Sequence, residues 1–445
     1  MDESVPAPSQ TFHQIACTRC GCVCDDLSVE VSADGGISGI STRCHLAVEF
    51  YESLRKPFSE YCPQINGVDV AFEEAVQEAA RLLQNARSPL LFGLSRSSTD
   101  GQRAACELAD LTSGTIDTTA SVGHGASIMA LQAAGESTST LGEVRHRSDL
   151  VIYWACDPME SHPRHVERFV DAVGMDVPNG RSDRYVVLVN SSVVPKQTSF
   201  ADQVIQLTPG SDFELFWTLR LILRGQNLHE STVAGVPVSE LIRLVDRMKN
   251  CRYGVIFFGV QLTEGRVGHA NVEALLRLVT DLNLQTRFVA RRMRIPGDVT
   301  GADSVLCWQT GYPFSVSLSR GYPRYHPGEY SAGTLLERGE TDCVVLIGGE
   351  RVHKFTERAR QHLARVPVIH LDPPRECYGV LSAVRFYTAI DGIHRNGTVY
   401  RMDEVPVPLR KLANSFLPSD EEVLKAISQI IRKRQSGEET VVSGL

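Results

Sequence analysis

Residues 17–26 read Cys17-Thr18-Arg19-Cys20-Gly21-Cys22-Val23-Cys24-Asp25-Asp26, and nineteen residues separate Cys24 from Cys44. Five of the twelve cysteines of the chain lie in this stretch. The spacing C-x2-C-x3-C with a distant fourth cysteine predicts that Cys17, Cys20, Cys24 and Cys44 bind one metal centre. It favours a [4Fe–4S] cluster over zinc, which more often takes two C-x2-C pairs. Cys22 is a fifth thiol that leaves the choice of ligands ambiguous, and a loop of unligated thiols is the alternative.

Length and charge restrict the class of protein. The chain has 445 residues, more than one ordinary domain, and a formal net charge of −8. An acidic balance argues against a nucleic-acid partner, which would need a basic face. No run of about eighteen apolar residues and no signal-peptide pattern is present, so we expect no membrane span and a cytoplasmic location. In that reducing compartment the cysteines are expected to be metal ligands or buried thiols rather than disulfides.

Outward from the cysteines, the apolar pattern alternates between strand and helix. Leu27–Val31 alternates apolar and polar residues, as a short strand does, and Phe72–Leu83 places its apolar residues on one helical face. Further apolar runs predict buried strands at 90–94, 115–119, 149–155, 185–190, 253–259, 342–349 and 366–371. Strands that alternate with helices in this way form parallel sheets with crossover helices.

The predicted fold class is therefore α/β. A small cysteine-rich β module at 13–64 precedes two doubly wound parallel halves, at 65–245 and 246–409. Residues 410–445 form a C-terminal helix and tail, and the helix begins at a capping box from Ser419 to Glu422.

Ligands of open α/β sheets bind beyond the carboxyl ends of the strands, so the loops there hold the candidate site residues. His124 lies between Gly123 and Gly125 after the strand at 115–119. The alternative to a functional role is that His124 is a structural histidine in a glycine-rich turn. The loop after the strand at 149–155 carries His162, Arg164 and His165, a group suited to bind an anion or a metal. The alternative is that these residues are only the polar start of a helix.

A third candidate segment, residues 299–330, is rich in aromatic residues, prolines and arginines and is predicted to be a long functional loop. Arg320 and Arg324 in it suit recognition of phosphate or carboxylate. The alternative is that Arg320 and Arg324 form contacts between subunits and bind no anionic ligand.

These motifs together resemble the B subunit of formylmethanofuran dehydrogenase, of the molybdopterin oxidoreductase superfamily. The resemblance runs from Cys17 to about Leu409 and rests on the cysteine motif and on 120–125, 162–165, 299–302, 308–313, 319–325 and 397–403. It implies a [4Fe–4S] cluster, a tungsten or molybdenum bis-pterin that converts carbon dioxide to formate, and A, C and D-type partner subunits. It also implies a superfamily fold without its C-terminal barrel domain, because only residues 410–445 remain after Leu409. An obligate hetero-oligomer is therefore expected.

One departure from the family pattern concerns Gly123. The dehydrogenase carries a metal-ligating cysteine or selenocysteine before the histidine that corresponds to His124. Glycine offers no thiolate, so the resemblance shifts to the B subunit of the bacterial formyltransferase/hydrolase complex. That complex works in tetrahydromethanopterin-linked one-carbon metabolism with a methanofuran-type carrier. The expected subunit is redox-inactive, without molybdopterin or tungstopterin. A genuine tungsten or molybdenum dehydrogenase subunit is the alternative.

If the redox site is lost, His124 and Arg294 are left over from it. A buried arginine still needs an acceptor, because it stays charged at ordinary pH. We therefore expect Arg294 to pair with a carboxylate or backbone carbonyls, and His124 to be neutral and hydrogen-bonded.

Overall fold

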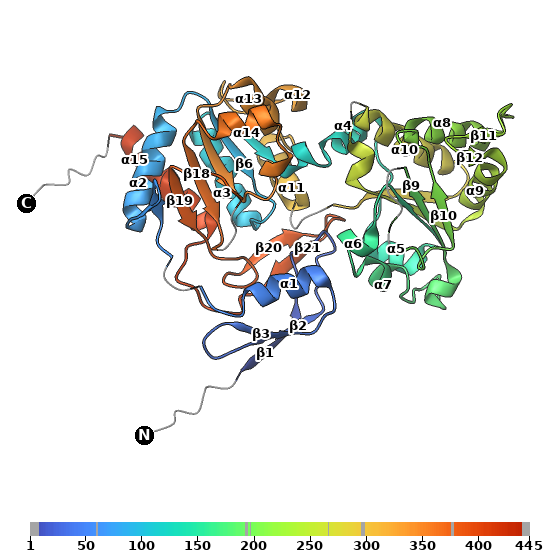
Figure 1. Cartoon of the computed structure of the whole chain (residues 1–445), viewed down its shortest axis with the longest axis horizontal. Coiled ribbons are helices and arrows are strands. Elements are labelled where there is room, and N and C mark those ends of the chain that lie inside the picture. The colour runs from blue at the N-terminus through green and yellow to red at the C-terminus, as the bar shows by residue number, and fades with distance from the viewer. Residues whose placement is uncertain are drawn as a thin grey trace, which may run out of the picture.

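The computed structural model describes residues 9–58, 61–191, 195, 197–265, 267–294, 299–374 and 378–437. Figure 1 shows two α/β lobes, with the N-terminal strands and the β20–β21 hairpin below and between them. The small N-terminal module consists of an antiparallel sheet and one helix: β1 (Gln10–Ile15), β2 (Leu27–Val31), β3 (Ile37–Ile40) and α1 (His45–Ser53).

The larger lobe holds a nine-stranded sheet in the order β16-β15-β7-β6-β17-β18-β19-β4-β5, in which β7, β6, β17, β18 and β19 run parallel. Its first part comprises β4 (Gln64–Ile65), β5 (Val68–Asp69), α2 (Phe72–Asn85), β6 (Pro89–Gly93), α3 (Thr99–Leu111), β7 (Thr115–Thr118) and the 3-10 turn η1 (Thr119–Val122). Helix α4 (Gly125–Ala134) follows and packs against the smaller lobe. Its second part comprises α11 (Val299–Thr310), β15 (Val316–Ser317), β16 (Arg324–Tyr325), α12 (Pro327–Tyr330), α13 (Ala332–Arg338), β17 (Cys343–Ile347), η4 (Val352–Lys354), α14 (Glu357–Leu363), β18 (Val368–Asp372), β19 (Val384–Tyr387), β20 (Gly397–Tyr400), β21 (Pro406–Leu409) and α15 (Asp420–Gln435).

The smaller lobe is inserted between these two parts. Its main sheet has the order β10-β9-β8-β13-β14, and all five strands are parallel. The lobe comprises α5 (Leu141–Arg147), β8 (Leu150–Trp154), α6 (Pro158–Ser161), α7 (His165–Phe169), η2 (Gly180–Asp183), β9 (Tyr185–Asn190), β10 (Gln203–Gln206), α8 (Asp212–Leu223), β11 (Thr232–Val233), β12 (Val236–Pro237), α9 (Val238–Asn250), β13 (Tyr253–Phe258), η3 (Val260–Thr263), α10 (Gly268–Leu282) and β14 (Arg287–Arg292).

The apolar strands form because both faces of each main sheet are covered. Leu90, Val151, Val255 and Val345 are fully buried, as expected for parallel strands with helices on both sides. The inserted sheet turns one face to α8, α9 and α10 and the other to the cysteine module, whose Cys17 and Cys20 belong to the same apolar cluster as Val151 and Val255. The cysteine module is therefore part of the packed core.

The predicted α/β class, the strands and the capping box are confirmed. Ser419 accepts a hydrogen bond from the backbone of Glu422, which reaches back to the backbone N–H of Ser419. Each main sheet is open, so no closed barrel exists in the described part of the chain.

The boundary between the two lobes differs from the predicted consecutive halves. β13 and β14, from the predicted second half, pair with β8 of the first, and the nine-stranded sheet takes strands from both halves. Apolar runs of this kind carry no information about which strand lies beside which.

The predicted loop at 299–330 is wrong for its first part, because residues 299–310 form helix α11. Ala302, Val305 and Leu306 recur at helical spacing and are fully buried. The aromatic and proline residues that follow obscured that pattern.

None of the helices in the described residues is long and apolar enough to cross a membrane.

Candidate functional site

The carboxyl ends of β7 and β14, one from each lobe, meet at His124. This residue precedes α4, and only 4% of its surface is exposed. Its Nδ1 lies 3.3 Å from Ser127 Oγ, and its Nε2 lies 3.3 Å from the carbonyl oxygen of Met293. Burial, and then the charges of Arg294 and Arg292, lower the pKa of His124 well below its ordinary value. The expected neutral, hydrogen-bonded His124 agrees with this geometry.

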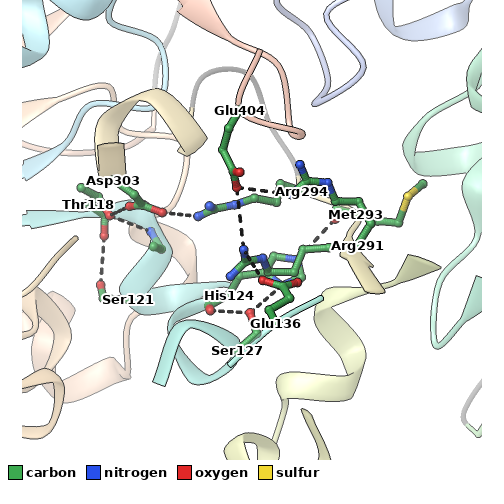
Figure 2. A network of polar contacts seen from close by, with 12 residues as sticks. Thr118, Ser121, His124, Ser127, Glu136, Arg291, Met293, Arg294, Asp303 and Glu404 are labelled. Atoms are coloured by element: carbon green, nitrogen blue, oxygen red, sulfur yellow. Dashed lines mark hydrogen bonds and ion pairs between the residues drawn. The ribbon is translucent and has the colours of Figure 1, made fainter. Parts of the chain in front are cut away.

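Arg294 has the carboxylate partner that the sequence led us to expect. Its Nη2 pairs with Asp303 Oδ2, and both side chains are buried (Figure 2). Asp303 also accepts a hydrogen bond of 2.7 Å from Thr118 Oγ1 at the end of β7. Burial raises the pKa of Asp303 even though the Arg294 charge acts against it. The ion pair joins β14 of the inserted lobe to α11 and β7 of the larger lobe.

Two further arginines extend this network, and one of them, Arg291, is labelled in Figure 2. Arg292 Nη2 lies 2.9 Å from Glu136, and Arg291 Nη1 lies 3.3 Å from Glu404. Glu404 follows Asp403 at the tip of the β20–β21 hairpin and has a φ of 64°, a left-handed conformation that is uncommon for a residue other than glycine. The hairpin tip is therefore tied to the inserted lobe beside His124.

His162 and His165 lie in the same region and are fully buried. His162 Nε2 lies 3.0 Å from the carbonyl oxygen of Arg294, and burial lowers the pKa of His162 to about 4. His165 Nδ1 lies 2.8 Å from the Tyr153 hydroxyl, whereas its Nε2 has no hydrogen-bond partner in the structure. Both are neutral core histidines, and His162 positions the backbone of Arg294.

Arg164 lies apart from this group, against the cysteine module. It makes two hydrogen bonds of 2.7 and 2.8 Å to Asp26, directly after the cysteine motif. Arg168, which the sequence analysis did not single out, pairs with Asp25 and Asp26. The position of Arg168 one helical turn after Arg164 was the available signal, because the two share a helix face.

The four predicted ligand cysteines line one small pocket, together with Arg164 and Arg19. Cys22 is not among the residues that line it, and the thiols of Cys20 and Cys22 are hydrogen-bonded to each other. Burial raises the pKa of Cys24 to about 12, so a bound cation would be needed to hold these sulfurs as thiolates. In the conformations that the structure describes, no three His, Cys, Asp or Glu side chains are arranged to hold a metal ion. The four cysteines line one pocket, and the [4Fe–4S] centre stays a prediction.

We expect replacement of Cys24 by Ser to lower the iron content of anaerobically purified protein from about four to about zero atoms per chain. Cys22→Ser is the matched control and should keep its iron, because Cys22 does not line the pocket. Iron analysis together with the visible absorption spectrum measures both. Equal iron loss in the two variants, or no iron in the parent protein, would contradict the assignment.

The structure does not bring Arg320 and Arg324 to this site. Arg324 lies on β16, level with Thr115 at the amino end of β7, and its Nη2 donates to Ser319 Oγ at 3.1 Å. Arg320 is exposed on the turn between β15 and β16. His124 lies at the opposite end of β7. Arg320 and Arg324 could therefore act together with His124 only on a molecule long enough to reach from one end of this strand to the other.

No family model matches the chain. Its sequence is 38% identical over 439 residues to the B subunit of tungsten-containing formylmethanofuran dehydrogenase 2 from Methanocaldococcus jannaschii, covering 95% of this chain and 99% of that one. The chain belongs to the family of formylmethanofuran dehydrogenase B subunits. The same-named protein of Methanococcus maripaludis is 36% identical over 94% of this chain and 98% of its own.

A more distant member of the family is the B subunit of the formyltransferase/hydrolase complex of Methylorubrum extorquens. It is 25% identical over 64% of this chain and 73% of its own. The solved structure of that complex with methylofuran contains a chain that matches with a TM-score of 0.71 and 21% identity, covering 84% of this chain and all of that one. Acetylene hydratase from Pelobacter acetylenicus matches with a TM-score of 0.70 and 10% identity over 95% of this chain and 70% of its own. These structures support the molybdopterin-oxidoreductase-like fold expected from the sequence.

Identity is thus higher to the two tungsten-containing members of the family than to the hydrolytic one. The expected kinship with the hydrolytic complex rests on Gly123 and not on overall identity. A Cβ atom added at Gly123 would meet Thr119 O at 3.4 Å and Ala120 O at 3.9 Å, which are ordinary contacts. Since a side chain would have room there, crowding does not explain the glycine.

A second pocket, which was not predicted from the sequence, lies beyond the carboxyl ends of β6, β17, β18 and β19. It opens where the chain order of the nine-stranded sheet reverses, between β6 and β17, the usual ligand position in such sheets. Asp372 ends β18 in this pocket, and its buried Oδ1 has no hydrogen-bond partner among the described residues. A nucleotide-bearing pterin cofactor, which carries N–H donors, fits this acceptor. The signal in the sequence was Gly348-Gly349 at the end of the predicted strand 342–349 and Asp372-Pro373 directly after the predicted strand 366–371.

The same pocket contains the carboxyl groups of Asp391 and Asp420. Burial and the neighbouring Asp420 raise the pKa of Asp391 to about 7, although Ser98 N–H donates to it at 2.9 Å. A carboxyl group whose pKa is raised by folding stabilises the protein below its unfolded pKa of about 4 and loses that contribution as the pH rises through its folded value. We therefore expect the free energy of unfolding of Asp391→Asn, relative to the parent, to increase between pH 5 and pH 8. Urea melts at several pH values measure this, and a pH-independent difference would show that Asp391 titrates normally.

Proposed function

We propose that the chain is the B-type subunit of a multi-subunit formyltransferase/hydrolase complex and performs no redox step itself. The observation that carries this proposal is Gly123. It stands next to His124 at the junction of the two lobes, where the dehydrogenases resembled by the sequence supply a cysteine or selenocysteine ligand. Without that ligand, a tungsten or molybdenum centre has no covalent attachment to this chain.

The polar groups around Gly123 support the same proposal. The charge of Arg294 is neutralised by Asp303, and both ring nitrogens of His124 have partners within the chain. Among the described residues, Nε of Arg291, Arg292 and Arg294 and Oε1 of Glu136 are buried without a hydrogen-bond partner, so the network pairs its charges but leaves these four atoms unsatisfied. In this proposal the network holds the two lobes together, and formyl transfer and hydrolysis take place on partner subunits.

The proposed partners are A, C and D-type subunits and a methanofuran-type formyl carrier. The support is the likeness of the fold to a chain of the formyltransferase/hydrolase complex with methylofuran. The proposed setting is tetrahydromethanopterin-linked one-carbon metabolism in the cytoplasm.

A second candidate function is that of a genuine tungsten or molybdenum dehydrogenase subunit. It is favoured by the 38% and 36% identity to tungsten-containing subunits over nearly the whole chain. The strand-end pocket with the unpaired Asp372 oxygen also fits a pterin nucleotide. In this case the metal would need a ligand other than residue 123.

Two assays on the same purified complex separate these functions. We expect formate release from formyl-tetrahydromethanopterin in the presence of the furan carrier, and no formate oxidation with a viologen dye as electron acceptor. Dye-linked formate oxidation that copurifies with this chain at constant specific activity would favour the dehydrogenase. The absence of both activities from the purified complex would reject both functions.

A further inference from the structure

A pocket rich in hydroxyl groups lies at the amino ends of β6 and β7, the ends of these strands that face away from His124. Ser88 precedes β6 in its lining, and Thr115 begins β7. Because β15 runs antiparallel to β7, Ser317 lies opposite Thr115 in the same lining. Helices α12 and α13, at the top of the larger lobe in Figure 1, border the pocket. Arg324, which its residue type assigned to anion recognition, also lines it.

Arg324 is held in this pocket and keeps one donor that nothing accepts. Its guanidinium lies over the ring of Tyr330, 5.0 Å from the centroid, and its Nη2 donates to Ser319 Oγ at 3.1 Å. Ser319 Oγ lies 3.1 Å from the hydroxyl of the buried Ser317. Nε of Arg324 is buried and has no hydrogen-bond partner among the described residues. Since an unmade hydrogen bond of a buried charged group is costly, an acceptor oxygen placed beside this Nε would be bound favourably.

The charges of the lining favour an anion. Arg87 lines the pocket together with Arg324, and no carboxylate of the described residues forms an ion pair with either guanidinium. Asp342 accepts hydrogen bonds of 2.8 and 2.9 Å from the backbone N–H groups of Arg87 and Ser88. Glu340 contributes an exposed carboxylate to the lining, so two positive side chains face one negative side chain.

We propose that this pocket binds a phosphate group. A phosphate has enough oxygens to accept from the Arg324 guanidinium and from several hydroxyl groups at once. A carboxylate has only two oxygens, which a guanidinium alone can satisfy, and it would leave the hydroxyl groups of Ser88, Ser113 and Thr115 without a use. The pocket is separate from the junction at His124 and from the strand-end pocket at Asp372, because both of those lie at the carboxyl ends of the strands.

The first test is a calorimetric titration of the purified complex with inorganic phosphate at constant ionic strength, so that general screening does not change. We expect saturable binding that Arg324→Met weakens by about tenfold or more, the usual effect of losing a hydrogen bond to a charged group. Arg324→Lys keeps the charge but removes the Nε donor, and it should also weaken binding. Arg358→Met is the matched control, because Arg358 is exposed on α14 and does not line the pocket.

The second test uses the opposing charge. Glu340→Gln removes the carboxylate from the lining and should tighten phosphate binding by about twofold, as expected for an exposed charge. Phosphate sites on other subunits would be unaffected by these substitutions, and melting temperatures without phosphate show whether each variant folds.

Two further ligands identify the source of the anion. Tighter binding of glycerol 3-phosphate than of inorganic phosphate would support a phosphate ester as the ligand, and the reverse order would support free phosphate. Tighter binding of succinate than of either would overturn the choice of phosphate over carboxylate. Phosphate binding that is the same in the parent and in both Arg324 variants, or an equal loss in Arg358→Met, would overturn the site itself.

Discussion

Replacement of Arg294 by Met is expected to destabilise the protein by about 3–5 kcal/mol, the usual cost of removing one partner of a buried ion pair. Asp303 would keep only Thr118 as a hydrogen-bond donor in its buried position. The loss should be larger at pH 8 than at pH 5. Burial already raises the pKa of Asp303, so protonation at low pH relieves the unpaired charge. Urea melts at the two pH values measure this.

Arg324→Met is the control for Arg294→Met. Its guanidinium is partly exposed and donates to a serine hydroxyl, so its loss should cost less than about 1 kcal/mol. If Arg294 serves only to hold the lobes together, the complex that still assembles should release formate at nearly the parent rate. A hundredfold lower rate of formate release by the fully assembled complex, equal to about 2.7 kcal/mol of transition-state stabilisation, would show that Arg294 takes part in catalysis.

A second large effect is expected from Gly21→Ala, between Cys20 and Cys22. The added methyl group would overlap the carbonyl oxygen of Arg294 and lie 2.9 Å from Met402 Cβ. The Gly21 carbonyl also accepts a hydrogen bond of 2.8 Å from Met402 N–H. The cysteine loop therefore cannot move away without loss of that bond, and we expect about 1–3 kcal/mol of destabilisation together with loss of bound iron.

Gly333→Ala is the matched control for Gly21→Ala. It lies inside α13, where the added methyl would meet Phe355 at an ordinary 3.6 Å, and it should be neutral or slightly stabilising. Thermal melts and iron analysis of both variants test the contact. A Gly21→Ala protein with parental stability and iron content would show that the cysteine loop packs less tightly against Arg294 than described.

The sequence predicted those features that local patterns determine. Unbroken apolar runs predict buried strands such as 253–258. The spacing of Ser419 and Glu422 predicts the capping box. The partner of Arg294 could be predicted as a class, since a buried guanidinium requires an acceptor. Its identity as Asp303 could not, because the pairing depends on how α11 returns beside β7.

Features that depend on pairing between distant segments were not predictable from one sequence. The inserted position of the smaller lobe follows from β13 pairing with β8, and each strand alone is compatible with several neighbours. The strand-end pocket exists only because β6 and β17 become adjacent. The end of β6 at Gly93 and the start of β17 at Cys343 lie far apart in the sequence. Arg320 and Arg324 suited anion recognition by residue type, but the antiparallel turn of β15 and β16 carries them to the opposite end of β7 from His124.

We propose that Gly123 leaves this chain without a redox metal. The most direct test is elemental analysis of the complex, purified without oxygen from cells supplied with both tungstate and molybdate. We expect less than about 0.1 atom of tungsten plus molybdenum per chain, with formate release intact. About one atom of either metal per chain, together with dye-linked formate oxidation, would contradict it.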